Sequence, residues 1–348
     1  MNAVIQLLIT HALITHITHY DIQKMKSYWI KSEGGKTALE LRELPVPQPK
    51  AGEIVVRMRA ASLNRGELLA SIGLHSLDEA RPAGGDGAGE VHALGEGVAG
   101  FKSGDRVMAR ARGFFSEYVV VRADQAFPMP ERLSWEQAGA IPTAFITAYE
   151  MLVPHGRLKS GEWLLVAGAS SGVGVACVQI GKVLGAHTIG TSGSKDKLER
   201  LKAAGLEVAI QARGRGFAEA ALNATGGKGV NLAIDLVGGT AFPDCLRVLA
   251  NQGRLAIVGY VDGVLKSEID LEPVHGKRLQ IFGISNTHLT AAERAEATRG
   301  FVRDVMPAVA DGRITPLVDK VFAFAQLPAA KDYVDSNAQL GKVVVRIA

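Results

Sequence analysis

The strongest constraint on the fold is the stretch WLLVAGASSGVGVACVQIGKVLGA, residues 163–186. A buried-type strand runs into a turn of small residues, and the turn opens directly into a helix with apolar residues on one side. Gly168, Gly172 and Gly174 stand where the chain must turn tightly and approach a bound group closely. The helix N-terminus adds unpaired N–H donors and a partial positive charge. This combination predicts a site for the pyrophosphate of a nicotinamide or flavin dinucleotide.

A glycine-rich turn alone is a weak signal, because ordinary strand-to-helix loops also contain glycines. The context strengthens it, since further strand-like runs follow at 187–190, 208–210, 231–236, 254–259 and 278–284. Six strands with helical connections predict an α/β fold with a doubly wound parallel sheet. Ligands of such sheets bind at the carboxyl ends of the strands. The residues expected at the dinucleotide are therefore Gly168, Ala169, Ser170, Ser171, Gly172, Val173, Gly174, Leu236, Val237, Gly259, Tyr260, Phe282, Gly283 and Ile284.

The end of the second strand indicates which dinucleotide binds. A carboxylate at that position bonds the ribose 2′-hydroxyl of NAD and repels a 2′-phosphate. This chain has no acid between His187 and Asp196. Its hydroxyl and cationic side chains suit a phosphate instead, namely Thr191, Ser192, Ser194 and Lys195. We therefore expect NADPH; the alternative interpretation of Lys195 is an exposed lysine at the start of a helix.

Composition limits the class of protein. The chain has 348 residues, which favours two domains, and its net charge of +4 comes from interspersed charges. We expect neither a nucleic acid nor a membrane as partner. The two cysteines, Cys177 and Cys245, suit a reducing, cytoplasmic compartment and cannot build a four-thiolate zinc site. Residues 1–24 lack Lys or Arg before Lys24, so we expect a poorly ordered N-terminal extension without a secretory signal.

Several further motifs occur in a fixed order: GGDGAGEVHALGEGVAGFKSGDRVMA (84–109), AIPTAFITAYEML (140–152), AGASSGVGVA (167–176) and GKVVVRI (341–347). In these motifs the chain resembles the medium-chain dehydrogenase/reductase superfamily, and within it the zinc-independent quinone oxidoreductase branch. The resemblance implies a GroES-like, β-rich catalytic domain formed by residues 25–150 and 285–348. A Rossmann domain, residues 151–284, would be inserted between them. It also implies a homodimer, for which the strand at 278–284 is the candidate edge.

The same resemblance suggests the chemistry. Where the zinc-dependent branch holds its metal, this chain carries Asn64-Arg65-Gly66-Glu67 and Gly84-Gly85-Asp86, so we expect no metal. Without a metal, hydride transfer to a carbon conjugated with a carbonyl is easier than alcohol oxidation, and the charge develops on oxygen. Asn64 matches the active-site asparagine of the family, and Arg65 beside it is a candidate for an anionic substrate group or for a surface ion pair. Glu67 is expected to be structural.

Thr143 matches a family position that touches the nicotinamide, and Lys342 is expected to approach the cofactor from the returning C-terminal strand. Leu69 replaces an aromatic residue that many relatives place over the substrate, and Ala212 replaces a stacking tyrosine, for which Arg213 or Arg215 are candidate substitutes. The expected function is an NADPH-dependent oxidoreductase acting on a quinone or an α,β-unsaturated carbonyl compound. The alternatives are an enoyl-thioester reductase and a non-catalytic NADPH-binding protein.

Overall fold

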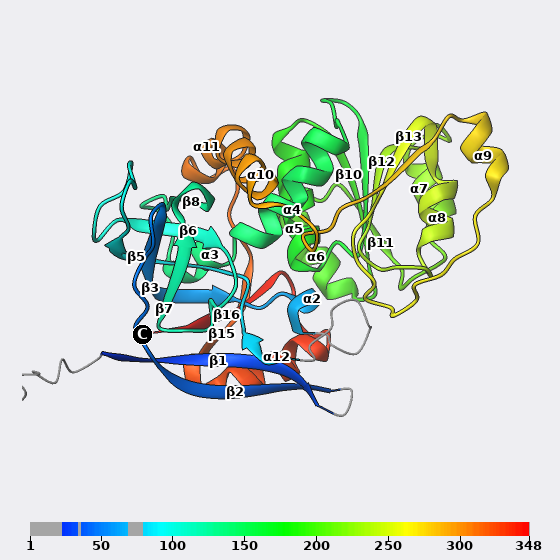
Figure 1. Ribbon diagram of the computed structural model, residues 1–348. Helices are drawn as coiled ribbons and strands as arrows, with labels where there is room; N and C mark the ends of the chain where they lie inside the picture. The colour runs from blue at the N-terminus through cyan, green and yellow to red at the C-terminus, as the bar shows by residue number, and fades with distance from the viewer. Residues whose placement is uncertain (1–22, 34–35, 69–78, 348) are drawn as a thin grey trace, which may run out of the picture.

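The computed structural model describes residues 23–33, 36–68 and 79–347. Two parts are evident in Figure 1: a β-rich part at the left and a parallel sheet flanked by helices at the right. The parallel sheet has the strand order β11-β10-β9-β12-β13-β14, and all of its strand pairs are parallel. Its strands are β9 (Trp163–Ala167), β10 (His187–Ser192), β11 (Val208–Gln211), β12 (Val230–Asp235), β13 (Leu249–Ile257) and β14 (Gln280–Gly283). The prediction of a doubly wound sheet is confirmed.

Helices cover both faces of this sheet, which is why the central strand β9 is apolar along its whole length. Leu164 and Val166 pack into one core, and Leu165 and Ala167 pack into another on the opposite face. The first face is covered by α4 (Pro142–Glu150), α5 (Gly172–Val183) and α6 (Lys195–Ala203). The second face is covered by α7 (Ala218–Ala224) and α8 (Phe242–Arg247). The short helix α9 (Leu271–Gly276) precedes β14.

The β-rich part is the GroES-like fold that the resemblance implies. Its main sheet has the order β15-β16-β3-β5-β6-β8, with β7 paired to β3, and a smaller sheet has the order β2-β1-β4. The bounds are β1 (Lys24–Glu33), β2 (Lys36–Pro45), β3 (Glu53–Ser62), β4 (Arg81–Pro82), β5 (Asp86–Leu94), β6 (Arg106–Arg110), β7 (Tyr118–Arg122), β8 (Ala126–Pro128), β15 (Val318–Ala323) and β16 (Lys342–Arg346). The C-terminal strand β16 lies between β15 and β3, so the C-terminal segment returns to the β-rich part, as the resemblance implies.

The two parts meet along α4, which contacts α5 on one side and β5 and β6 on the other. Pro142 ends the helical run begun by α3 (Trp135–Gly139) and is the first residue of α4, where its missing N–H costs nothing. The chain leaves the parallel sheet after β14 and returns through α10 (Ala291–Asp304), α11 (Met306–Ala310) and α12 (Leu327–Asp335). One apolar core includes Met108 and Phe127 of the β-rich part and Leu164 of the parallel sheet.

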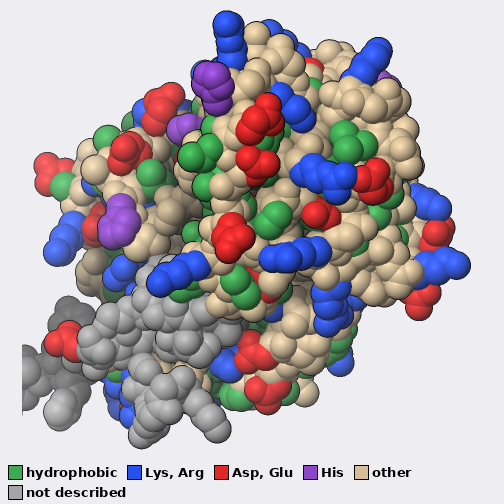
Figure 2. All heavy atoms as spheres, turned by 90° about the vertical axis from the view of Figure 1, so that its right-hand side faces the viewer, with side chains coloured by type: hydrophobic (Ala, Val, Ile, Leu, Met, Phe, Trp, Pro, Cys, Tyr) green, Lys and Arg blue, Asp and Glu red, His purple; other side chains and the backbone are tan. Residues whose placement is uncertain are grey.

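The domain limits 25–150 with 285–348, and 151–284, stay a prediction. Residues 1–22 of the expected extension lie outside the described residues. Within the described residues, no helix has the length and apolar character that crossing a membrane requires. Figure 2 shows the end of the molecule that carries the parallel sheet, where Lys and Arg side chains alternate with Asp and Glu and form no single-sign patch.

Candidate dinucleotide site and buried charge cluster

The glycine turn has the geometry that a pyrophosphate site requires. Gly168 has a positive φ of +85°, and Ser171 caps α5 by accepting a hydrogen bond from the Gly174 N–H at 3.0 Å. A Cβ on Gly174 would lie 2.5 Å from the Gly168 carbonyl oxygen and 2.7 Å from the Ala169 Cα. Both positions therefore require glycine, one for its backbone conformation and the other for space. The N-terminus of the twelve-residue helix α5 lies directly behind the turn.

The end of β10 is tied to this turn through its hydroxyl groups. The Gly168 N–H donates to Thr191 Oγ1 at 3.2 Å, and Ser192 Oγ donates to Ser170 Oγ at 3.0 Å. Ser194 caps α6 by accepting a hydrogen bond from the Lys197 N–H at 3.4 Å. The structure thus brings the predicted residues that follow β9 next to the predicted residues at the end of β10.

Cations surround the N-terminus of α6. A Cβ on Gly193 would lie 2.9 Å from the Arg213 Nε, so the Arg213 guanidinium lies against the backbone after β10. The pKa of Lys197 is lowered first by burial and then by the positive charges of Arg213, Arg200 and Arg65, although Asp319 opposes this. Lys195 is exposed at the start of the helix. Hydroxyls, cations and the N-terminus of α6 together can bind a phosphate.

The ends of β12 and β13 are held by an acid that was not predicted. The Asp235 carboxylate is buried and accepts hydrogen bonds from the Val237 and Gly238 N–H groups, each at 2.9 Å. Burial raises its pKa to about 6, although these two donors favour the charged form. The Gly259 N–H donates to the Asp235 carbonyl at 3.4 Å. Asp235 therefore fixes the turn that contains the predicted residues Leu236 and Val237; Tyr260 follows Gly259.

The C-terminal strand meets the glycine turn. The Gly341 N–H donates to the Ser170 carbonyl at 2.9 Å, and Ser171 and Gly341 form an isolated β-bridge. A Cβ on Gly172 would overlap the aliphatic stem of Lys342. The Lys342 Nζ donates to the Leu63 carbonyl at 3.0 Å and to Asn64 Oδ1 at 2.6 Å. Lys342 thereby connects the glycine turn of one part to Asn64 of the other.

Asn64, Glu67, Asp86 and Lys342 form a group that we call the buried charge cluster. The Asn64 amide nitrogen donates to Asp86 Oδ1 at 2.7 Å and to Glu67 Oε1 at 3.0 Å. Asp86, fully buried, also accepts from Ser62 Oγ at 2.7 Å and from the Thr143 N–H at 2.8 Å. Residues 62–64 and Thr143, which lie far apart in the sequence, therefore converge at Asp86. Both amide hydrogens of Asn64 are used within the cluster.

Burial is the main cause of the pKa shifts of Glu67 and Lys342. Burial raises the pKa of Glu67 to about 8, and the negative charge of Asp86 adds to the shift; Lys342, Asn64 and Arg81 oppose it. Burial also lowers the pKa of the Lys342 ammonium, which Asp86 and Glu67 oppose. The raised pKa of Glu67 therefore favours its neutral form near pH 7. A Cβ on Gly85 would overlap the Glu67 carboxyl group, so Gly85 provides the space that this side chain occupies.

The Arg65 side chain is directed to α12 and not to the buried charge cluster. Its guanidinium donates to the Val334 carbonyl of α12 at 2.9 Å, and burial lowers its pKa while Asp335 opposes that shift. The structure thus places Arg65, a predicted substrate-binding residue, against α12, and its role toward a substrate stays a prediction. Leu69, the position of the missing aromatic residue, lies outside the described residues.

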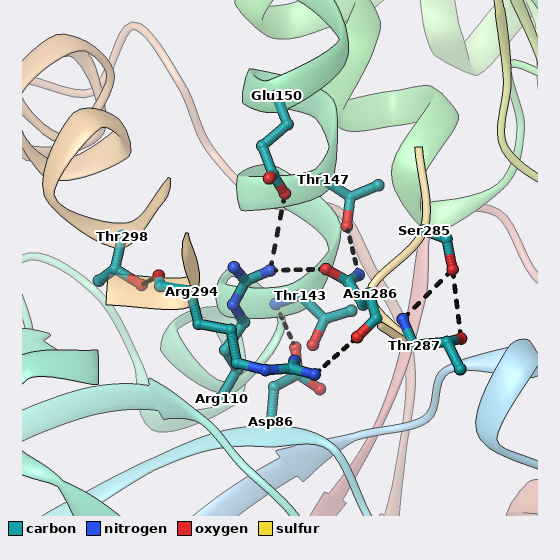
Figure 3. A network of polar contacts seen from close by, with 10 residues as sticks. All are labelled: Asp86, Arg110, Thr143, Thr147, Glu150, Ser285, Asn286, Thr287, Arg294 and Thr298. Carbon is teal, nitrogen blue, oxygen red and sulfur yellow. Dashed lines mark hydrogen bonds and ion pairs between the residues drawn. The ribbon is translucent and has the colours of Figure 1, made fainter. Parts of the chain in front are cut away.

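A second polar network, drawn in Figure 3, fixes the segment after β14. Arg110, the last residue of β6, donates to Asn286 Oδ1 at 3.0 Å and lies 3.8 Å from Glu150 Oε2. The Asn286 amide donates to Thr147 Oγ1 of α4, and Arg294 of α10 donates to the Asn286 carbonyl. This network positions the chain that follows the predicted residues Phe282, Gly283 and Ile284. No sequence signal singled out Arg110 or Asn286.

Within the described residues, no group of three or more His, Cys, Asp or Glu side chains is arranged to hold a metal ion. The metal-free site stays a prediction.

Comparisons with known proteins agree with the architecture. Residues 50–131 match the family described as alcohol dehydrogenase GroES-like domain, and residues 172–301 match the family described as zinc-binding dehydrogenase. A zinc-type alcohol dehydrogenase-like protein of Schizosaccharomyces pombe is 31% identical over 90% of this chain and 96% of its own length. The rat (Rattus norvegicus) quinone oxidoreductase is 26% identical over 92% of this chain and 97% of its length.

Two further matches are informative. A phenolphthiocerol/phthiocerol polyketide synthase protein of Mycobacterium tuberculosis is 31% identical over 91% of this chain, which spans only 14% of that protein's length. A mycobacterial protein solved in complex with NADPH has a TM-score of 0.83 and 25% identity, covering 93% of this chain and all of that one. A GroES-like part joined to a Rossmann sheet with this glycine turn defines a two-domain oxidoreductase. The chain belongs to the medium-chain dehydrogenase/reductase superfamily.

Proposed function

We propose that this chain is a zinc-independent, NADPH-dependent oxidoreductase that reduces quinones or α,β-unsaturated carbonyl compounds. The observation that carries the proposal is the meeting of the glycine turn with the buried charge cluster through Lys342. The turn would hold the pyrophosphate, and the cluster would face the reacting end of the cofactor beside Thr143. Similarity to the rat quinone oxidoreductase supports the substrate class. When bound, NADPH supplies the hydride.

The chain's own residues would bind the cofactor and stabilise developing charge. Thr143, whose N–H is fixed by Asp86, would contact the nicotinamide, and the backbone of residues 282–284 would hold its carboxamide. Lys342 uses two of its three N–H bonds on the Leu63 carbonyl and on Asn64 Oδ1, so one remains for a substrate oxygen. Asn64 has both amide hydrogens engaged, so its predicted role as donor to the substrate requires one of these bonds to open.

Reduced-nicotinamide absorbance tests the proposal directly. We expect oxidation of NADPH, and much slower oxidation of NADH, with a panel of small quinones or a panel of small enones. A chelator should leave the rate unchanged because no metal takes part. Tight NADPH binding without turnover on either panel would contradict the proposal.

An enoyl thioester is the second candidate substrate, because the chain is similar to a segment of a polyketide synthase. The hydride step is the same, since the thioester carbonyl is conjugated with the double bond that is reduced. A short enoyl thioester added to the enone panel distinguishes the two candidates: turnover confined to the thioester would favour the second.

Arg213 carries the preference for NADPH in this proposal. Arg213→Ala removes the cation that lies against Gly193, and with it a charge-assisted hydrogen bond worth about 1.5–3 kcal/mol. We expect the dissociation constant for NADPH to rise by about 10- to 100-fold and that for NADH to change little. Titration of cofactor fluorescence measures both. Arg247→Ala, which removes an exposed arginine of α8 that pairs with Glu219, is the matched control. Equal weakening of both cofactors would contradict the assignment.

We also propose a homodimer and a cytoplasmic location. β14 is the edge of the parallel sheet, and Ile281 on it is exposed, as are Leu265 and Leu271 nearby in the sequence. Pairing of β14 with a second copy would cover these groups. Sedimentation should give twice the chain mass, and Ile281→Lys should shift it toward the single chain. The two buried, unpaired cysteines support the location.

A further inference from the structure

Glu67 has no function in the mechanism so far, yet its environment is unusual for a structural acid. Its Oε1 accepts a hydrogen bond from Asn64 at 3.0 Å. Its Oε2 is buried and, among the described residues, has no hydrogen-bond partner. A buried carboxylate oxygen without a donor is costly, whereas a carboxylic acid can keep its proton there. The geometry therefore favours a neutral Glu67 whose O–H is not engaged by any of the described residues.

The position of this acid is defined by the rest of the cluster. Glu67 shares the Asn64 amide with Asp86, and Asn64 in turn accepts a hydrogen bond from Lys342. Lys342 lies on Gly172 of the glycine turn, and Asp86 holds the N–H of Thr143. Asn64, Asp86 and Lys342 are thus connected to segments that the proposed function assigns to the cofactor. The carboxyl group fills the space that any side chain on residue 85 would need.

We propose that Glu67 is the acid that protonates the substrate after hydride transfer, an inference that rests on the proposed function. The conjugated double bond receives one hydride at its β-carbon, which NADPH supplies as it becomes NADP⁺, and one proton at its α-carbon. The proton comes from the Glu67 carboxyl group: its O–H bond breaks, the α-carbon C–H bond forms, and a carboxylate remains. A proton from the solvent then returns to Glu67, so that each turnover consumes one hydride from NADPH and one solvent proton.

The charged groups that face Glu67 support this role. Asp86 of β5 disfavours ionisation of Glu67, whereas Lys342 of β16 and Arg81 of β4 favour it. The result is a pKa of about 8, so the acid is protonated at neutral pH and weak enough to be reprotonated easily. Ionisation during the reaction is assisted by the Lys342 ammonium, which then faces two carboxylates.

The first test needs no turnover. Because the pKa of Glu67 is raised from 4.5 to about 8, the folded chain binds more protons than the unfolded chain between these two values. This group therefore makes the free energy of unfolding fall as the pH rises from about 5 to 8. Glu67→Gln, which imitates the neutral acid, should fold and should lose that part of the pH dependence. Glu136→Gln on α3, an acid with a lowered pKa paired with Arg346, is the matched control and should keep it.

The second test follows the proton. In heavy water the unmodified chain should place deuterium on one face of the α-carbon of an enone product. Glu67→Gln should lower the turnover of enones by about 100-fold or more and yield both configurations, because water then reaches either face. Quinone reduction should fall much less, since an oxygen anion takes a proton from water readily. The NADPH dissociation constant should not change.

The outcomes are distinguishable. If the unmodified chain reduces neither panel, the proposed function fails and the acid role fails with it. If it reduces enones, and Glu67→Gln keeps both the rate and the single configuration, the acid role alone is overturned. An unchanged pH dependence of unfolding in Glu67→Gln would likewise overturn it, because Glu67 would then carry no proton at neutral pH.

Discussion

Lys342→Met is expected to lower the free energy of unfolding by about 3–5 kcal/mol, because it leaves Asp86 buried without its cation. The Leu63 carbonyl and Asn64 Oδ1 would also lose their shared donor at 3.0 and 2.6 Å. Methionine keeps the length of the stem that lies on Gly172, so the loss reports the charge and the hydrogen bonds and not a cavity. Denaturant unfolding near pH 7 measures the effect.

Two further variants show whether the loss of stability in Lys342→Met comes from the buried charge. Lys228→Met removes an exposed lysine and should change the free energy of unfolding by less than about 0.5 kcal/mol. Adding Asp86→Asn to Lys342→Met should recover part of the stability, since the unpaired negative charge is then gone. Asp86→Asn could instead lower the stability of the Lys342→Met variant by as much as it lowers the stability of the unmodified protein. The two residues would then not be coupled, and the ionic account of the cluster would be wrong.

The parallel sheet could be predicted because its signals are local. β9 is buried on both faces and reads as a continuous apolar run, and the small residues of the turn follow directly. The GroES-like part rests on resemblance, since the pairing of β16 between β15 and β3 joins segments far apart in the sequence.

The buried charge cluster could be predicted only in part. Family positions indicated Asn64 and Thr143, and Lys342 was expected to approach from the returning strand. The structure brings all three to Asp86 or to one another. Glu67 was expected to be structural. The sequence does not reveal the burial of its carboxyl group, and burial is what raises its pKa. Nothing in the sequence indicates that the missing side chain at Gly85 makes room for the Glu67 carboxyl group.

Contacts between side chains and partners far away in the sequence were harder still to predict. Arg65 neighbours Asn64 in the sequence, but its guanidinium reaches the carbonyl of Val334, 269 residues away. In the sequence, nothing distinguishes Arg110 from other residues at strand ends. Its partner Asn286 lies in the chain after β14, and only the fold brings the two together. Asp235 ends an apolar run, which would have been a usable signal, because an acid at a strand end can bind the N–H groups of the following turn.

Gly174→Val is expected to weaken NADPH binding by about 100-fold while the β-rich part keeps its fold. The new Cβ would lie 2.5 Å from the Gly168 carbonyl oxygen and 2.7 Å from the Ala169 Cα, and neither is the end of a flexible side chain. To remove this steric overlap, α5 must move away from the turn, at a cost of about 1–3 kcal/mol for overpacking. The same movement withdraws the helix N-terminus from the expected pyrophosphate position.

Cofactor fluorescence measures the affinity, and circular dichroism reports whether the fold persists. Gly276→Ala at the end of α9 is the matched control, because its Cβ would meet only the far end of Glu272 at 3.3 Å and its φ is not positive. The control should bind NADPH normally. Normal binding by Gly174→Val would mean that the pyrophosphate does not lie at this turn, since a bulky side chain cannot be accommodated there without displacing the backbone that would hold it.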